Sequence, residues 1–234
     1  MSLAGGGVVA IWNDITDEGR ANFYEWHNRE HIPERVGIDG FLRGRRYIAL
    51  AGEPEYFTLY EVRDRGVLGS ESYLARLNAP TSWTTESVRH FRNVSRSLCA
   101  TDFSRGAGSG GYLGTLRFDT DPATDEALLD LLTGELEKLL ESPAMVAAHI
   151  CRADVAVSTA KTAEQKGRPD NVVPRWVVMI EGSRPEPVTA ALDGPLGAAA
   201  LQAFAPIGAA RGTYVLEFDL VAPALGPGAR ATPR

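Results

Sequence analysis

The feature that most constrains the fold of this 234-residue chain is an order of strands and helices that occurs twice. Each occurrence reads strand, helix, strand, strand, helix, strand. The expected strands are Gly6–Asn13, Phe41–Ala51, Glu55–Val62 and Val94–Phe103, then Tyr112–Phe118, Met145–Val157, Arg175–Glu181 and Tyr214–Val221. The expected helices are one that ends near Ile32, Ser70–Leu77 and Thr84–Phe91, then Asp125–Glu141 and Val188–Phe204. A recurrence at half the chain length indicates a repeated domain, not a solenoid of short units.

Each half matches the split βαβ, or ferredoxin-like, plan. Four antiparallel strands with both helices on one side leave the other sheet face bare, and that face must be buried. The other half of the chain can cover it. We therefore expect an α+β fold in which two ferredoxin-like repeats pack their sheets face to face into an intramolecular dimeric α+β barrel. The expected domains are residues 1–105 and 112–222, joined by a Gly-rich linker at 106–111 and followed by a flexible tail at 223–234.

One stretch, FYEWHNREHIPERVGIDGFLRGRRY at residues 23–47, combines residue types that suit a functional site. At 100° per residue, one side of its helix carries aromatic, imidazole and carboxylate groups. These residues are Phe23, Trp26, His27, Glu30 and His31. A surface helix normally turns an apolar side inward, and the second half has an ordinary Leu/Glu helix, ALLDLLTGELEKLL, at this place. The site is therefore expected in the first half.

Composition excludes some classes of function. A net charge of −6 disfavours nucleic-acid binding, which depends on Lys and Arg neutralising phosphates. No apolar run approaches the ~20 residues of a membrane-spanning helix. The start of the chain, MSLAGGGVVAIW, lacks the cationic region of a secretory signal, so we expect a cytoplasmic protein. Cys99 and Cys151 are expected to be buried free thiols.

The run WHNREHIPERVGIDGFLRGRRY resembles the pattern W-[HY]-x-x-E-H-[IL]-P-E-R…G-F…R-[RY] of uncharacterised bacterial proteins in the dimeric α+β barrel superfamily. That superfamily also contains EthD-like proteins, muconolactone isomerases, antibiotic-biosynthesis monooxygenases and small polyketide cyclases. The match covers residues 12–60. It implies a ferredoxin-like fold, a pocket between the first helix and the sheet, and no metal or organic cofactor. Relatives of this kind are usually single-domain homodimers, so this chain is expected to be a monomeric pseudo-dimer or a homodimer.

The residues of the motif suggest roles for a small-molecule site. His31 would be a general acid or base, because imidazole titrates near neutral pH, with Glu30 or Glu34 orienting it. Arg43 or Arg46 would neutralise a carboxylate or an enolate. The binding surface for a planar or apolar molecule would come from side chains in or beside the motif. These are Trp12, Tyr24, Trp26, His27 and Tyr47.

Two functions are consistent with these residues. The first is a cofactor-independent enzyme that acts on a small aromatic or polyketide-like molecule by proton transfer, as an isomerase or cyclase, or by oxygenation. The second is a non-catalytic binding or accessory protein that holds a hydrophobic metabolite. An inward imidazole beside carboxylates favours the enzyme, since a binder needs only the aromatic side chains.

Three alternatives remain open for particular residues. His27 and His31 can be structural histidines near the end of a helix, where the helix dipole favours them. The sequence His27–His31 also spells H-x-x-E-H, a metal-binding pattern, but the helix is expected to falter at Ile32 before Pro33 and no further acidic ligand is evident. Pro33 is expected to start a further turn that runs to Val36. His90 is expected in the core or at the pocket rim, and His149 is expected to be structural. Residues 158–169 are expected to be an exposed, dispensable loop.

Overall fold

The strands form one closed antiparallel barrel, in the order β1-β3-β2-β8-β5-β7-β6-β4. A computed structural model describes residues 3–159, 162–165 and 172–222. Its strands are β1 Gly7–Ile15, β2 Phe41–Gly52, β3 Tyr56–Val62, β4 Phe91–Gly106, β5 Tyr112–Asp119, β6 Met145–Ala153, β7 Trp176–Gly182 and β8 Ile207–Val221. The α+β fold class and the intramolecular barrel are confirmed.

The barrel closes through strand pairing between the halves as well as through packing of their inner faces. Within each half the strands have the ferredoxin-like order, β4-β1-β3-β2 and β8-β5-β7-β6. The halves join where β2 pairs with β8 and β4 pairs with β6. The last strand of each half is longer than expected because it serves two neighbours. The end of β4, from Cys99 to Gly106, pairs with β6 in the other half.

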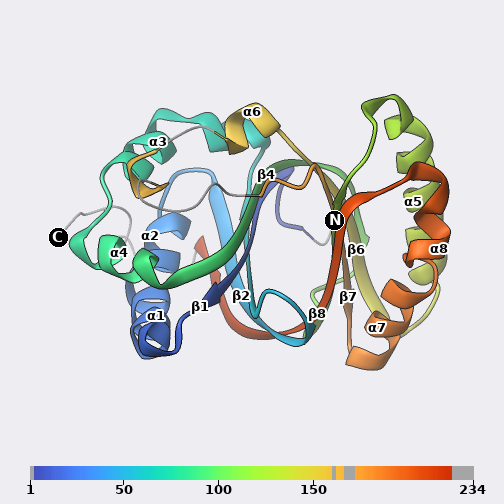
Figure 1. Ribbon diagram of the computed structural model, residues 1–234, viewed down its shortest axis with the longest axis horizontal. Coiled ribbons are helices and arrows are strands. Elements are labelled where there is room, and N and C mark those ends of the chain that lie inside the picture. The colour runs from blue at the N-terminus through green and yellow to red at the C-terminus, as the bar shows by residue number, and fades with distance from the viewer. Residues whose placement is uncertain (1–2, 160–161, 166–171, 223–234) are drawn as a thin grey trace.

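Helices cover the two outer sides of the barrel (Figure 1). On the first half these are α1 Arg20–Trp26, a π-helix at His27–His31, α2 Ile32–Val36, α3 Glu71–Asn78 and α4 Ser82–Ser87. On the second half they are α5 Asp125–Leu139, α7 Pro185–Asp193 and α8 Ala198–Leu201. One further short helix, α6 Val155–Ser158, follows β6 of the second half but lies beside α3 over the first half (Figure 1).

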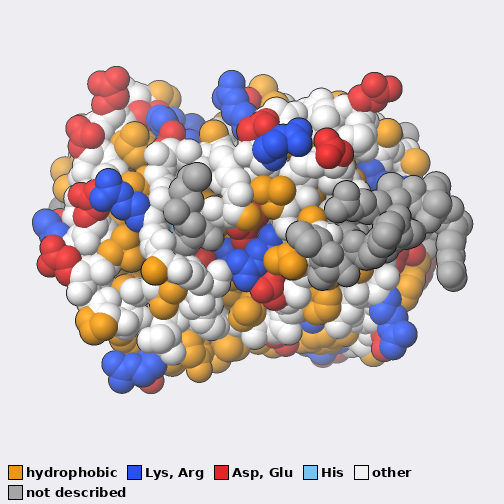
Figure 2. All heavy atoms as spheres, turned by 180° about the vertical axis from the view of Figure 1, so that it is seen from behind, with side chains coloured by type: hydrophobic (Ala, Val, Ile, Leu, Met, Phe, Trp, Pro, Cys, Tyr) orange, Lys and Arg blue, Asp and Glu red, His pale blue; other side chains and the backbone are white. Residues whose placement is uncertain are grey.

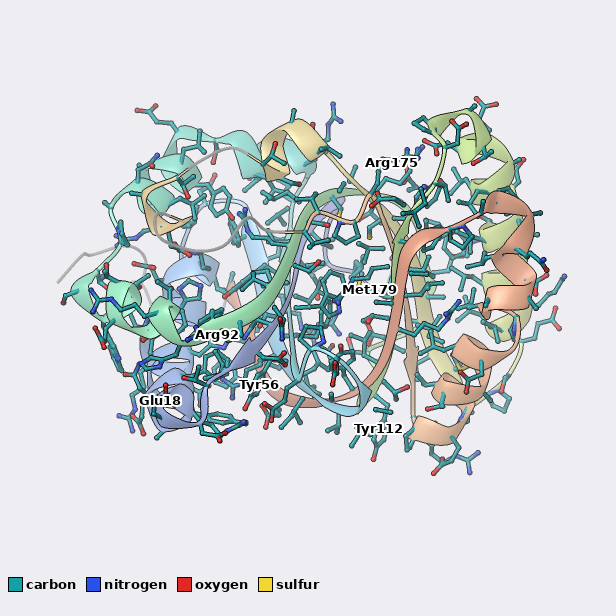
Figure 3. The ribbon with its side chains drawn as sticks, viewed as in Figure 1. Glu18, Tyr56, Arg92, Tyr112, Arg175 and Met179 are labelled. Atoms are coloured by element: carbon teal, nitrogen blue, oxygen red, sulfur yellow. The ribbon has the colours of Figure 1, made fainter. Side chains whose placement is uncertain are left out.

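Alternation along the strands separates the interior of the barrel from the helix-covered faces. The interior cluster takes one set of alternating residues from all eight strands: Val8, Ala10, Trp12, Tyr47, Phe57, Leu59, Cys99, Leu113, Cys151, Val177, Met179 and Tyr214. Figure 3 shows Met179 between the halves, whereas Tyr56, on the other face of β3, lies towards α1. Cys99 and Cys151 are both buried and free, as expected.

A buried ionic cluster lies inside the barrel and connects its halves. Arg45 on β2 pairs with Glu61 on β3 at 2.9 Å and with Glu181 on β7 at 3.1 Å. His149 on β6 contacts the same Glu181 at 3.3 Å and Ser104 at 3.0 Å, so it is a structural histidine. Burial by itself raises the pKa of Glu181, but the hydrogen bond with His149 and the charge of Arg45 outweigh this and lower it to about 2.

The connection between β6 and β7 differs from the expected exposed loop. The expected strand Met145–Val157 ends at Ala153, because Asp154 caps α6 by accepting a hydrogen bond from the Val157 N–H. Ser158 is buried, and its hydroxyl accepts from the Leu98 N–H on β4 at 3.0 Å. The expectation that residues 158–169 form an exposed loop is therefore wrong at Ser158; residues 160–161 and 166–169 lie outside the described residues, as does the tail at 223–234.

The face shown in Figure 2 carries charges of both signs. On the face in Figure 2, Lys and Arg are interspersed with Asp and Glu, without one continuous basic area. No helix within residues 3–159, 162–165 and 172–222 is long and apolar enough to span a membrane.

Candidate functional site

The helix that carries the motif does not break at Pro33 but widens before it. Residues His27–His31 form a π-helix in which the Ile32 N–H donates to the carbonyl of His27, five residues earlier. Proline clashes with the carbonyl four residues before it in a regular helix, and a π-turn relieves such a clash by displacing that carbonyl. The helix then continues as α2. π-turns of this kind are frequent at functional sites.

The widened turn places both histidines in one stack. The rings of His27 and His31 lie 5.6 Å apart with an interplanar angle of 23°. Trp26 packs on His31 at 4.2 Å, and Phe23 packs on His27 at 4.8 Å. Both imidazoles are buried, with 4% and 7% of their surface exposed. Phe23, Trp26, His27 and His31 are buried, as the helical period predicted, whereas Glu30, expected on the same side, is only half-buried.

A small cavity of about 40 Å³ lies between this stack and the sheet. Its walls come from the π-helix, from β1, β3 and β4, and from the β6–β7 connection of the second half. They are Ile11, Asn13, Trp26, His27, His31, Thr58, Phe91, Val94, Arg96 and Glu164. The expected pocket between the first helix and the sheet is therefore present. It holds three of the expected site residues, namely Trp26, His27 and His31.

His27 is held as a neutral imidazole. Burial, the neighbouring His31 and the guanidinium of Arg46 lower its pKa well below the ordinary value. Arg46 Nη1 lies 3.3 Å from His27 Nδ1. A guanidinium can only donate, so Nδ1 is the acceptor and Nε2 of the neutral ring carries the proton. His27 is thus a hydrogen-bond donor of fixed tautomer.

We expect stability to fall as the pH drops below 6.5 because of His27. In this range the unfolded chain protonates His27 and the folded chain does not, so the unfolded state binds more protons. The free energy of unfolding then decreases by up to about 1.4 kcal/mol per pH unit. Denaturant unfolding of wild type and His27→Gln from pH 7.5 to 5 measures this, since Gln keeps an acceptor for Arg46. If the difference in the free energy of unfolding between wild type and His27→Gln stays constant with pH, the prediction is wrong.

Arg46 and Glu30, expected to act with His31, are engaged outside the cavity wall. Arg46 donates to Glu217 at 3.1 Å and to Asn28 at 2.7 Å, and its guanidinium lies 4.6 Å from the ring of Tyr24. Its charge is therefore already balanced by Glu217. Glu30 accepts a hydrogen bond of 2.6 Å from the hydroxyl of Thr81, which caps α4. Arg46 thereby holds the motif helix against β2, and Glu30 holds it against α4. The Tyr24 hydroxyl also donates to Glu217, at 3.1 Å.

The expectation that Trp12, Tyr47 and Arg43 line the same pocket is wrong. Trp12 and Tyr47 are fully buried inside the barrel, on the opposite face of the sheet from the histidines. The physical reason is the two-residue period of a strand, which sends adjacent Arg46 and Tyr47 to opposite faces. Arg43 shares the face of Tyr47 and forms a bidentate pair with Asp219, at 2.7 and 2.6 Å.

Four polar residues of the cavity were not singled out as site residues: Asn13, Thr58, Arg96 and Glu164. The strand alternation that places Ile11 on the helix side also places Asn13 there, and this signal could have identified it. Arg96 is paired with Ile11 across β1 and β4. Glu164 comes from the second half and forms an ion pair with the buried Arg35 of α2. Only the three-dimensional structure shows this last contribution. His90 is absent from the walls of this cavity and bonds to Thr16 at 2.9 Å.

The H-x-x-E-H pattern lacks the partners that a metal needs. Within the part of the chain that the structure describes, no three His, Cys, Asp or Glu side chains are grouped closely enough to hold a metal ion. Glu30, the acidic residue of the pattern, bonds to Thr81 and Thr84. These residues do not fit a metal centre of that class.

Comparison with known proteins identifies the architecture. No family model and no curated protein matches the chain. An anthrone oxidase-like protein matches with a TM-score of 0.63 and 13% identity, over 92% of each chain. A candidate monooxygenase from Fusobacterium nucleatum has a TM-score of 0.58 and 7% identity, over 94% of this chain and 96% of that one. One from Lactobacillus acidophilus has a TM-score of 0.55 and 12% identity, over 93% and 97%.

The likeness is one of fold. At these identities the matched structures establish the architecture alone, and they do so over nearly the whole chain.

Proposed function

We propose that this protein is a cofactor-independent enzyme that acts on a small aromatic or polyketide-like molecule at the cavity beside His27 and His31. The observation that carries the proposal is that two buried imidazoles, of His27 and His31, and the half-buried side chain of Arg96 line a single cavity. Burying polar groups costs free energy unless they are paired, and apolar residues would pack this site more favourably. A catalytic need for proton donors and acceptors accounts for them. The names of the matched structures, an anthrone oxidase-like protein and two candidate monooxygenases, agree with this class.

The roles of the residues follow from their surroundings. His31 takes a proton from the substrate, since His27 is held neutral and its Nδ1 is occupied by Arg46. The Nε2–H of His27 is available as a donor. We assign the stabilisation of a developing anion to Arg96 instead of the expected Arg46, because Arg96 lines the cavity and Arg46 does not. Glu30 and Arg46 are positioning residues.

Two reactions follow from proton removal. The substrate anion is either reprotonated at another carbon, which is an isomerisation or cyclisation, or oxidised by dissolved dioxygen. The cavity volume of about 40 Å³ exceeds the ~10–15 Å³ that a cavity needs to hold one water molecule. It therefore accommodates a small reactant such as water or dioxygen beside the reacting end of a larger molecule.

The test is a turnover screen with anthrones, quinols, aromatic acids and polyketide-like lactones, run in air and under argon. Product formation in air alone, with uptake of oxygen, indicates oxygenation. Product formation under both gases indicates proton transfer. Binding detected by a rise in melting temperature, without product from any compound, would contradict the enzyme and leave the non-catalytic binding protein.

A further inference from the structure

A second and larger cavity lies next to the histidine site. Its volume is about 320 Å³, within the range of small-molecule pockets. It is lined by α3 and the turn before it, by β4, and by α6 and Thr162 of the second half. The lining is apolar apart from Tyr73, Arg96 and Thr162, and its apolar members include Leu68, Leu74, Leu77, Leu98 and Val157.

Arg96 forms the boundary between the two cavities. It lines both of them. Arg96 and Leu98 lie two residues apart on β4, so they share its helix-covered face. The Arg96 guanidinium donates to the Tyr73 hydroxyl at 2.8 Å, which places it beside the apolar cavity. A guanidinium has five N–H donors and no acceptor, so a ligand group that meets it there must be an acceptor.

Residues of the second half complete the lining of both cavities. Ala156, Val157 and Thr162 line the larger cavity, and Glu164 lines the smaller one. Several contacts among the described residues hold this connection between β6 and β7 over the first half. The Ser158 hydroxyl accepts from the Leu98 N–H at 3.0 Å, the Asn78 side chain accepts from the Ala163 N–H at 3.1 Å, and Glu164 pairs with Arg35. The second half, which carries no motif of its own, thereby supplies walls to the site in the first half.

We infer that the larger cavity binds the apolar body of the substrate, with an oxygen acceptor of the substrate (a carboxylate or a phenolate) against Arg96 and the reacting carbon beside the histidines. Ala156, Val157 and Thr162, the cavity residues that come from the connection between β6 and β7, are then specificity determinants. The inference rests on the proposed function only where it calls the bound molecule a substrate. Binding to the cavity is testable by itself.

The test uses 2-naphthoate as the probe, measured by titration calorimetry on the full chain. Gly69→Leu adds a side chain at the cavity wall, where a Cβ would meet no heavy atom within 4 Å. We expect affinity to fall at least about tenfold, or about 1.4 kcal/mol. Gly111→Leu is the matched control, because a Cβ there also meets nothing within 4 Å and Gly111 is not among the cavity residues. It should bind as wild type does.

A second variant tests the orientation of the bound ligand, whose acceptor group is expected against Arg96. Arg96→Met should remove the preference for 2-naphthoate over the cation 2-naphthylmethylammonium, which wild type should bind at least about tenfold more weakly. No binding of 2-naphthoate to wild type, or equal binding to wild type and Gly69→Leu, would overturn the inference even if the enzyme turns over. The expected binding pattern without turnover would uphold the inference and refute the proposed enzyme.

Discussion

Replacing Arg45 with methionine is expected to lower the free energy of unfolding by about 3–5 kcal/mol. Arg45 is fully buried and pairs with two equally buried carboxylates, Glu61 and Glu181. Methionine fills a similar volume but leaves both carboxylates without their main positive neighbour. Removing one member of a buried ion pair costs far more than the pair contributes, because the remaining charge cannot be hydrated.

Denaturant unfolding at pH 7 measures this effect, with Arg43→Met as the matched control. Arg43 lies two residues away on the same strand face and pairs with Asp219, but 15% of its side chain is exposed. We expect the control to cost about 1 kcal/mol or less. Equal losses in the two variants would show that Arg45 has no special role in closing the barrel.

The same ionic cluster determines how the free energy of unfolding changes at acid pH. The folded pKa of Glu181 is about 2, below its ordinary 4.5, so the stability it contributes is present above pH 4.5 and is lost as the pH falls towards 2. In Arg45→Met the folded pKa of Glu181 should rise, so the loss should still begin near pH 4.5 but should be smaller and end at a higher pH.

Replacing His31 with glutamine is expected to reduce turnover by about 10²- to 10⁴-fold, the usual contribution of a general acid or base. Glutamine retains most of the volume against Trp26 and cannot exchange a proton near neutral pH. The melting temperature should change little. His90→Gln is the control, because His90 bonds to Thr16 and is absent from the cavity walls, and its turnover should stay within about twofold.

A rescue experiment separates catalysis from structure. His31→Ala should lose turnover in the same way, and added imidazole should restore part of it with a dependence on pH that follows the free base. A variant that melts well below wild type and is not rescued would instead assign His31 to the structural role of a buried histidine.

Features that depend on residues close together in the sequence could be predicted from the sequence. The period of 3.6 residues brought Trp26, His27 and His31 to one inward side of the helix, and the structure places all three on one cavity. The order of strands predicted an α+β barrel, and the barrel is closed. The π-turn was not predicted, because the clash of Pro33 can be relieved either by ending a helix or by widening it.

The sequence alone thus determined the fold class and which helix carries the candidate site, because strand alternation, helical period and the spacing of two histidines are local properties of the chain. The tertiary structure decided the rest. It put Tyr47 inside the barrel, joined Arg45 to Glu181 across the halves, and brought Arg96 and Glu164 to the histidines. Glu164 lies 133 residues beyond His31 in the chain. Such contacts arise from the register of strand pairs between halves and from a connection that crosses over a neighbouring sheet, and no local pattern specifies either.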